Sequence, residues 1–339
     1  MKPKNTPEAV LNRKGRTVLL LSLLASAGAF IIQVLGFIAV MFLKLPEDSL
    51  ATTTVIQGFS AGAGILGMLA LGGASWLGTS REDLTDTFRT SRIIVIADIL
   101  IFGISLVSIA IEGSQIAPDW PINLALTALV CLGIGIAEEA AFRGIYLNGI
   151  LAVAGKSHRG TMWGVAITSL LFGLAHVDLS TDFAEPLLAA QAILKIAQTG
   201  LLSVIFCSVV MRTRRLGGVA LVHGLSDFLL MAPSVVLIGE DLDPQYVSTG
   251  EEGISSIILY SVIIAIYLPI AIKAIRRMRR EQVTYRGAFM ERAVREYEAS
   301  LAAGTPAADG TPDAAQTGAP NDSAVLDHQG LPVPPGGFN

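Results

Sequence analysis

The stretch Gly135-Ile136-Ala137-Glu138-Glu139-Ala140-Ala141-Phe142-Arg143-Gly144 places two carboxylates and a guanidinium in the middle of a long apolar run. A charge at the centre of a bilayer costs about 2.5–3.5 kcal/mol on insertion scales. Three such charges within six residues are hard to explain unless they have a function. We therefore interpret this stretch as the candidate active centre of a membrane-spanning helix, around which the rest of the chain is organised.

The composition of the whole chain agrees with a membrane protein. Of its 339 residues, 52% are hydrophobic and only 15% are charged, and the mean hydropathy is +0.60. These values lie outside the balance of a soluble globular domain. The two cysteines, Cys131 and Cys207, fall inside apolar runs and are interpreted as packing residues rather than as a disulfide or metal framework.

Eight apolar runs are long enough, or nearly long enough, to cross a bilayer. They cover residues 17–43, 54–77, 93–111, 122–151, 161–176, 187–211, 216–238 and 254–275, and the fifth is the shortest. The first follows a basic start but exceeds a signal-peptide core, so we read it as an uncleaved helix. The pattern predicts an all-α fold, a polytopic transmembrane helix bundle of about eight helices.

The placement of Lys and Arg predicts the orientation of this bundle. Basic residues follow the second, fourth, sixth and eighth runs, whereas the connections 112–120, 177–186 and 240–253 have none. Cytoplasmic loops carry the excess of Lys and Arg, so both termini are predicted to be cytoplasmic, which requires an even number of crossings. Anionic lipid and topology explain the basic clusters, and no nucleic-acid partner is expected.

Polar residues inside the fourth run divide into a pair and a single acid. Glu139 and Arg143 are four residues apart with the acid first, the favourable order for a helical ion pair. Glu138 is rotated by about 100° from Glu139 and faces elsewhere. One alternative is that all three form a single network that only stabilises the bundle. The other gives Arg143 the structural role and leaves Glu138 free for chemistry.

Two further runs carry histidines. His176 ends the fifth run, and His223 and Asp227 lie four residues apart in the seventh, hence on one helix face. Each feature alone has an ordinary structural explanation, such as an interfacial His or a self-satisfied His–Asp pair. Together with Glu138 they supply two imidazoles and two carboxylates from three helices, a set suited to binding a divalent metal or activating water.

These residues resemble the motifs of a known family. Glu138 to Arg143 matches its Glu-Glu-x-x-x-Arg motif, Phe172 to His176 its Phe-x-x-x-His motif, and His223 to Asp227 its His-x-x-x-Asn/Asp motif, in the same order. The family is that of the CAAX protease and bacteriocin-processing (CPBP, or Abi) intramembrane proteases. The resemblance covers roughly residues 123–230.

The resemblance implies peptide-bond hydrolysis by water without a covalent intermediate. Glu138 would be the general base with His176 assisting, and Glu139 and Arg143 would position that base. His223 and Asp227 would stabilise the oxyanion or hold a metal. The implied cofactor is a divalent metal, with zinc the expected ion, and its ligands would be Glu138, His176, His223 and Asp227.

Asp227 bears on the choice between a metal site and a metal-free site. Many members of the family have Asn at this position. An ionised Asp would repel an oxyanion, so Asp227 must be protonated, oriented by His223, or bound to a metal. We expect the metal, because it would reverse the local charge balance.

Residue counts predict the depth of the candidate site. With a rise of about 1.5 Å per residue, His223 and Asp227 fall roughly 10 and 16 Å from the cytoplasmic boundary, but a straight fifth helix puts His176 roughly 20 Å from it. Helix five must therefore start below the boundary, tilt or be recessed. The opening is expected on the cytoplasmic side. Asp98 and Lys195, also in apolar runs, are interpreted as structural.

The predicted organisation has four parts. Residues 1–16 form a basic cytoplasmic N-terminus, 17–275 the transmembrane domain with a protease-like core at 122–239, 276–300 a charged cytoplasmic helical extension, and 301–339 a disordered tail. The expected partners are the lipid bilayer and a membrane-associated protein or peptide substrate, CAAX-type or otherwise. Two other functions stay open: a proton-coupled transporter or channel, and a catalytically silent membrane scaffold or immunity protein.

Overall fold

The computed structural model describes residues 6–46, 49–178, 180–237 and 246–302, so most of the predicted disordered tail lies outside the described residues. Within these ranges the chain is helical and has no β-strand. The helices are α1 (Pro7–Leu43), α2 (Leu50–Ala70), α3 (Arg81–Glu112), α4 (Trp120–Glu139), α5 (Leu147–Ala154), α6 (His158–Leu174), α7 (Pro186–Thr213), α8 (Gly217–Val235), α9 (Gly250–Arg280) and α10 (Glu291–Ala302), with a π-helical segment at Ala140–Tyr146 and single 3₁₀ turns at Ala74–Trp76 and Ala288–Met290.

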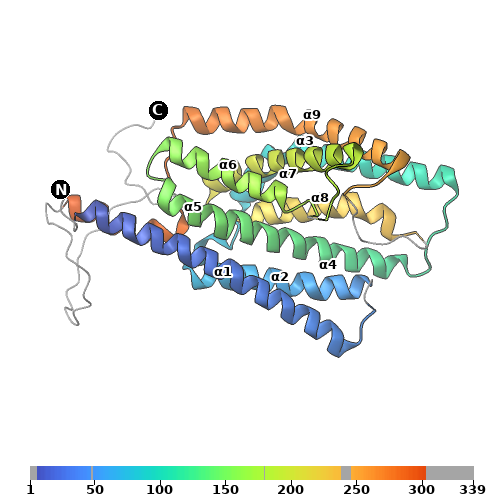
Figure 1. The fold of residues 1–339 in the computed structure, drawn as a ribbon, viewed down its shortest axis with the longest axis horizontal. Helices are drawn as coiled ribbons and strands as arrows, with labels where there is room; N and C mark the ends of the chain where they lie inside the picture. Colours follow the sequence, from blue (N-terminus) through green and yellow to red (C-terminus); the bar gives the residue numbers. More distant parts are fainter. Residues whose placement is uncertain (1–5, 47–48, 179, 238–245, 303–339) are drawn as a thin grey trace.

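The long helices lie side by side as an antiparallel bundle, and the start of α1 lies at the same end of it as the C-terminal end of α9 (Figure 1). Helix α4, the π-helical segment and α5 form one continuous rod, so α1 to α9 make eight rods. Seven rods are long and apolar enough to span a membrane; α6, the predicted short fifth helix, has 17 residues. The predicted all-α bundle of about eight helices, in a multi-pass membrane protein, is confirmed.

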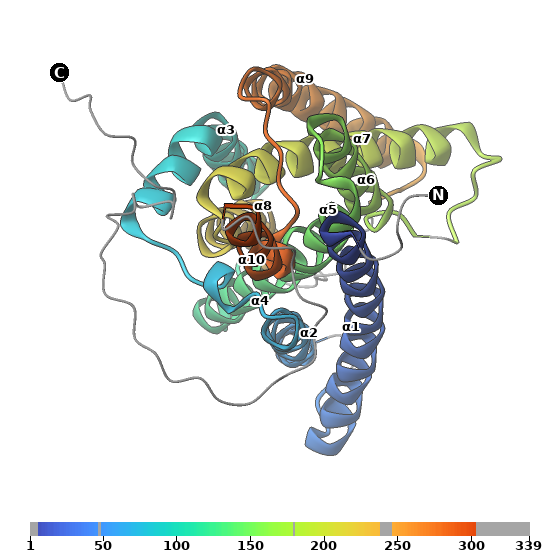
Figure 2. The same ribbon diagram turned by 90° about the vertical axis from the view of Figure 1, so that its left-hand side faces the viewer.

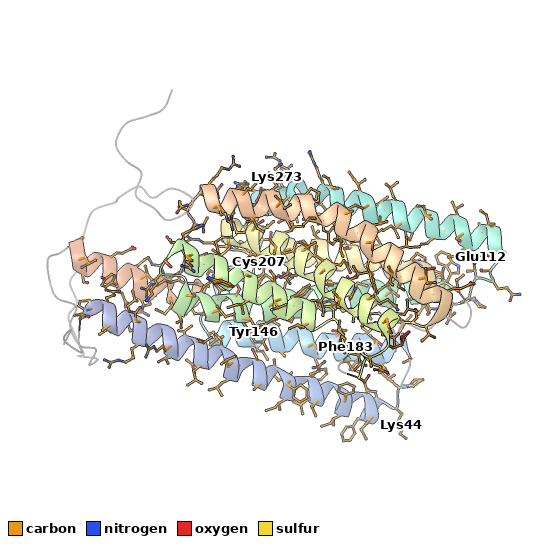
Figure 3. All side chains as sticks on the ribbon, turned by 45° about the horizontal axis from the view of Figure 1, so that its top comes forward. Lys44, Glu112, Tyr146, Phe183, Cys207 and Lys273 are labelled. Atoms are coloured by element: carbon orange, nitrogen blue, oxygen red, sulfur yellow. The ribbon has the colours of Figure 1, made fainter. Side chains whose placement is uncertain are left out.

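The bundle exposes apolar side chains and buries polar ones, as a protein surrounded by lipid does. Large apolar side chains point outward along α1, α3 and α9, among them Phe30, Ile104 and Ile258. Buried polar residues include Asn148, Thr168 and Gln191. Figure 3 shows side chains projecting from the outer faces of the rods, with Lys44 and Glu112 at the bundle end away from α10.

Several helices begin earlier than the apolar runs predict, because capping residues and not hydropathy set their starts. Thr6 caps α1 by accepting a hydrogen bond from Ala9 N, and Pro7 occupies the first turn. Helix α3 begins 12 residues before the predicted run, at a capping box of Ser80 and Asp83. The basic N-terminus therefore belongs to α1 over most of its length.

The charged extension does not continue α9 as the sequence suggested. Helix α9 ends at Arg280, and residues 281–287 turn the chain back toward the bundle before α10 begins. Figure 2 looks along the bundle from this end and shows α10 in front of the rods while α1 splays away from them. We name residues 283–290, which make the contacts described below, the C-terminal strap.

Helices α4 and α8 make a close backbone approach at the centre of the bundle. Gly135 of α4 lies against Ala220 and Gly224 of α8, and Gly224 in turn lies against the backbone of Cys131. A Cβ at Gly135 would lie 2.9 Å from Gly224 N, so a larger residue would force the helices apart. This contact brings the side chains that follow Gly135 within reach of those on α8.

Candidate active site

The predicted ion pair on α4 is formed. Arg143 Nη1 donates to Glu139 Oε1 at 2.9 Å, and both side chains are fully buried. A buried charge without a partner is costly, so each side chain depends on the other. Arg143 therefore fixes one oxygen of Glu139 inside the bundle.

The helix changes its geometry at this pair. Residues Ala140–Tyr146 form a π-helix, and Leu147 N donates to Phe142 O, five residues back. The α-helical period of 3.6 residues assumed from the sequence therefore holds only up to Glu139, the last residue of α4. Short π-helical segments occur often at functional sites, and this one carries Arg143.

His223 connects α8 to both carboxylates of α4. Its Nδ1 lies 2.9 Å from Glu139 Oε1 and donates to that oxygen when it carries the proton. Its Nε2 then faces Glu138 Oε2 at 3.6 Å and Asp227 Oδ2 at 3.7 Å. Glu139 thus orients the imidazole, and the other ring nitrogen points to the two remaining acids.

His176 reaches the same acid from a third helix. It lies just beyond the end of α6, where its Nδ1 donates to Phe172 O at 2.7 Å. That bond leaves Nε2 directed at Glu138 Oε2, 3.8 Å away. The structure therefore brings together all six predicted residues: Glu138, Glu139, Arg143, His176, His223 and Asp227.

The depth conflict at His176 disappears because the helices do not start at one shared boundary. Glu138 precedes the end of α5 by 16 residues and His176 follows the start of α6 by 18, so both lie at one level from the α5–α6 turn. Helix α8 instead starts inside the bundle, where Leu216 packs beside Gly144. The recessed helix is α8 and not α6.

The Glu138 side chain makes no direct hydrogen bond within the part of the chain that the structure describes. Its Oε2 is buried and has no hydrogen-bond partner among the described residues. The distances of 3.6 and 3.8 Å to the two imidazoles are too long for direct hydrogen bonds. A water molecule or a substrate group between them would satisfy all three groups.

Aromatic rings enclose the charged groups. The Phe172 ring lies 4.0 Å from Arg143 Cζ and 4.6 Å from the His176 ring, and Phe206 of α7 lies 5.8 Å from the His223 ring. Both phenylalanines are fully buried. Phe206 was missed from the sequence, because an apolar residue in an apolar run gives no signal of its own.

Asp98 and Lys195 have defined partners. Asp98 accepts a hydrogen bond from Ser226 Oγ at 2.6 Å, next to Asp227 in the sequence. Lys195 Nζ lies 4.1 Å from the centre of the Tyr246 ring and 5.5 Å from that of Tyr260. Each of the two side chains therefore has a partner inside the bundle.

The four candidate metal ligands have suitable donor atoms, but their present arrangement does not form a metal site. Two imidazole Nε2 atoms and two carboxylates face one another, and the Nδ1 atoms of both imidazoles are held by other groups, as in zinc sites. Among the described residues, however, no three His, Cys, Asp or Glu side chains are arranged to hold a metal ion as they stand.

Two cavities meet at the end of α6. A polar cavity of about 840 Å³ is lined by His176, by the α6–α7 connection and by residues 246–249 before α9. An apolar groove of about 630 Å³ runs between α1 and α6 past Phe142. They share Ala175 and Val177. The polar cavity lies at the bundle end opposite α10 and the start of α1, so it does not support the predicted cytoplasmic opening.

Comparison with known proteins agrees with the motifs. Residues 120–229 match the model of a family described as type II CAAX prenyl endopeptidase Rce1-like. This segment runs from the start of α4 to Leu229 of α8 and contains all six site residues. No curated protein and no solved structure matched the chain. The match confirms the resemblance to the CPBP family and indicates a protease of the membrane.

Proposed function

We propose that this chain, whose residues 120–229 match the Rce1-like CAAX endopeptidase family, hydrolyses a peptide bond of a membrane-associated substrate with water activated by Glu138. One observation carries the proposal. Glu138 Oε2 is buried without a hydrogen-bond partner, between the Nε2 atoms of His176 and His223. Glu139 is bonded to Arg143 and His223 through Oε1, whereas the Glu138 side chain makes no hydrogen bond to a described residue that would explain it as a structural group.

In the proposed reaction Glu138 takes a proton from the bound water. The water oxygen bonds to the carbonyl carbon of the substrate, and the carbonyl oxygen becomes an oxyanion. The carbon–nitrogen bond then breaks, and the protonated Glu138 gives its proton to the leaving amine. His176 holds the water. Its Nδ1–H donates to Phe172 O, so the neutral ring presents a lone pair on Nε2 that can accept a hydrogen bond from the water.

The oxyanion is assigned to His223. Its Nδ1 is held by Glu139, and in the imidazolium form its Nε2–H would donate to the developing negative charge. Asp227 Oδ2 lies 3.7 Å from Nε2, beyond hydrogen-bond distance, so it would act on an imidazolium through its charge and not by holding the ring. Of the three states open to Asp227, orientation by His223 is the one that this contact supports.

A divalent metal stays a prediction of the sequence. If bound, it would be held by Glu138, His176, His223 and Asp227 and would polarise the scissile carbonyl. No step above depends on it, because the described side chains do not present three ligands as they stand. The metal content of the purified protein, compared with that of His223→Ala, tests this prediction.

The cavities support a substrate with an apolar anchor and an extended peptide. The groove beside Phe142 is lined almost entirely by apolar side chains and would hold the hydrocarbon part, CAAX-type prenyl groups included. The peptide would continue past Ala175 into the polar cavity at His176. In this proposal the scissile bond lies at the junction of the two, beside His176.

Replacing either site histidine should stop cleavage of a membrane-anchored reporter peptide by the purified protein in lipid vesicles. His176→Ala and His223→Ala are each expected to lower the rate about 100-fold or more, since general acid–base groups contribute about 10²–10⁴-fold. His328→Ala is the matched control, because His328 lies outside the predicted transmembrane domain. Equal rates in all three variants would reject the proposed site.

The side of the membrane on which the polar cavity opens follows from the orientation of the chain. We propose cytoplasmic termini, so the exposed Ser180 beside the cavity should lie outside. Ser180→Cys should react with a membrane-impermeant maleimide on intact cells, and Arg279→Cys, at the other end, only after permeabilisation. The two native cysteines are buried and give a low background. The reverse labelling pattern would contradict this orientation.

A further inference from the structure

One buried side chain of the active-centre helix is hydrogen-bonded to the C-terminal strap. Asn148 lies in α5, directly after the π-helical segment, and is fully buried. Its Oδ1 accepts a hydrogen bond from Ala288 N at 2.7 Å. Its Nδ2 donates to Gly144 O at 2.8 Å and to Arg143 O at 3.0 Å. The side-chain amide thus connects the strap to the residue that holds Glu139.

The π-helical geometry creates the need for this amide. In an α-helix Leu147 N would donate to Arg143 O, four residues back. Here Leu147 N donates to Phe142 O instead, which leaves the Arg143 carbonyl without its usual donor. An unpaired buried carbonyl is unfavourable, and Asn148 Nδ2 supplies the missing hydrogen bond. Asn148 therefore stabilises the π-helical geometry against the α-helical one.

The strap is itself held at several points. The Tyr285 ring stacks on Trp76, with 5.9 Å between ring centres, and its hydroxyl donates to Glu291 at 2.6 Å. Met290 is buried against Leu11 of α1. Gly287 has a φ of +84° and lies against the Asn148 backbone, where a side chain would not fit. These contacts fix the position of Ala288 N relative to Asn148.

The path from the strap to the reacting groups is short. Arg143 Nη1 bonds to Glu139 Oε1, which is also the partner of His223 Nδ1. A return of this segment to α-helical geometry would rotate Arg143 relative to Glu139. The orientation of the His223 ring, and with it Nε2 opposite Glu138, would then no longer be fixed.

We propose that Asn148 is a positioning residue for the reaction, and that the strap, through Ala288 N, holds Asn148 in the orientation that keeps Arg143 and Glu139 in place. The inference rests on the proposed function for its kinetic consequence. Its structural part, the dependence of the π-helical segment on the strap, is independent of any activity.

The sharpest variant is Ala288→Pro in the full-length chain, which removes one N–H outside the membrane-spanning rods. Gly287 has a ψ of 155°, which a following proline accepts, and Ala288 is the first residue of its 3₁₀ turn, a position that tolerates proline. Ala288→Gly is the matched control, since it keeps the N–H. Asn148→Asp is the second variant: it keeps the shape of the side chain but not its donor.

With the purified protein in vesicles, Ala288→Pro and Asn148→Asp are expected to lower kcat by about 10- to 100-fold with KM within about twofold, as misplacement of a catalytic group does. Ala288→Gly should stay within about twofold of wild type. Hydrogen exchange of residues 140–149 should be faster in the first two variants and unchanged in the third. Unchanged exchange in a folded Asn148→Asp would overturn the inference. If exchange is faster in the two variants but the wild-type protein cleaves no reporter, the proposed function is rejected and the structural part of the inference stands.

Discussion

Glu138→Gln is expected to lower the rate of reporter cleavage by about 10³-fold or more, within the range for loss of a general base. The amide cannot take a proton from water, yet it has the size of the carboxylate and can still sit between the two imidazoles. Because Glu138 makes no short hydrogen bond in the structure, the replacement should leave the fold intact. The measurement is the initial rate with purified protein in vesicles.

Glu138→Asp and the unfolding midpoint serve as controls for this variant. Shortening the side chain moves the carboxylate away from Nε2 of His176 and His223 but keeps a base, so an intermediate rate is expected. The unfolding midpoint of Glu138→Gln should equal or exceed that of wild type, because a partly buried charge has been removed. A Glu138→Gln protein that is folded and still active at the wild-type rate would rule out Glu138 as the base.

Arg143→Met should have the second large effect, and chiefly on stability. It leaves Glu139 buried without its cation, and breaking a buried ion pair in this way typically costs about 3–5 kcal/mol. Cleavage should fall as well, because Glu139 then no longer fixes His223. The free energy of unfolding in detergent and the cleavage rate at matched folded fraction measure the two effects separately.

A double replacement distinguishes loss of the pair from loss of packing. Arg143→Met combined with Glu139→Gln removes both charges, so stability should recover relative to Arg143→Met alone while cleavage should not. Arg277→Met is a control on an exposed pair with the same four-residue spacing, with Glu281 at 2.7 Å, and should change stability by about 1 kcal/mol or less. Full recovery of cleavage in the double variant would show that Arg143 and Glu139 do not position His223.

The sequence was sufficient for the bundle and for the members of the site. Apolar runs and the placement of Lys and Arg are set by the bilayer itself, so helix number could be predicted from them. The pairing of Glu139 with Arg143 followed from their spacing, since four residues apart means one face of a helix. The free acid, Glu138, followed from the same geometry.

Features that depend on contacts between distant segments could not be predicted. The depth of His176 relative to His223 and Asp227 could not be predicted, because it depends on where α8 starts. That helix starts beside Gly144, inside the bundle. The π-helical segment and the role of Asn148 depend on Ala288, 140 residues further along the chain. Phe206 lies in a mainly apolar run that any buried helix could contain. No local pattern marks such residues.

The most direct test of the account is to identify the products formed from one defined substrate. Purified wild-type protein in vesicles is incubated in H₂¹⁸O with a membrane-anchored peptide, and the new termini are identified by mass spectrometry. The account predicts one new amine and one new carboxylate that carries ¹⁸O, formed by wild type and absent with Glu138→Gln. An intact peptide with wild type, or the same labelled product from both proteins, would contradict it.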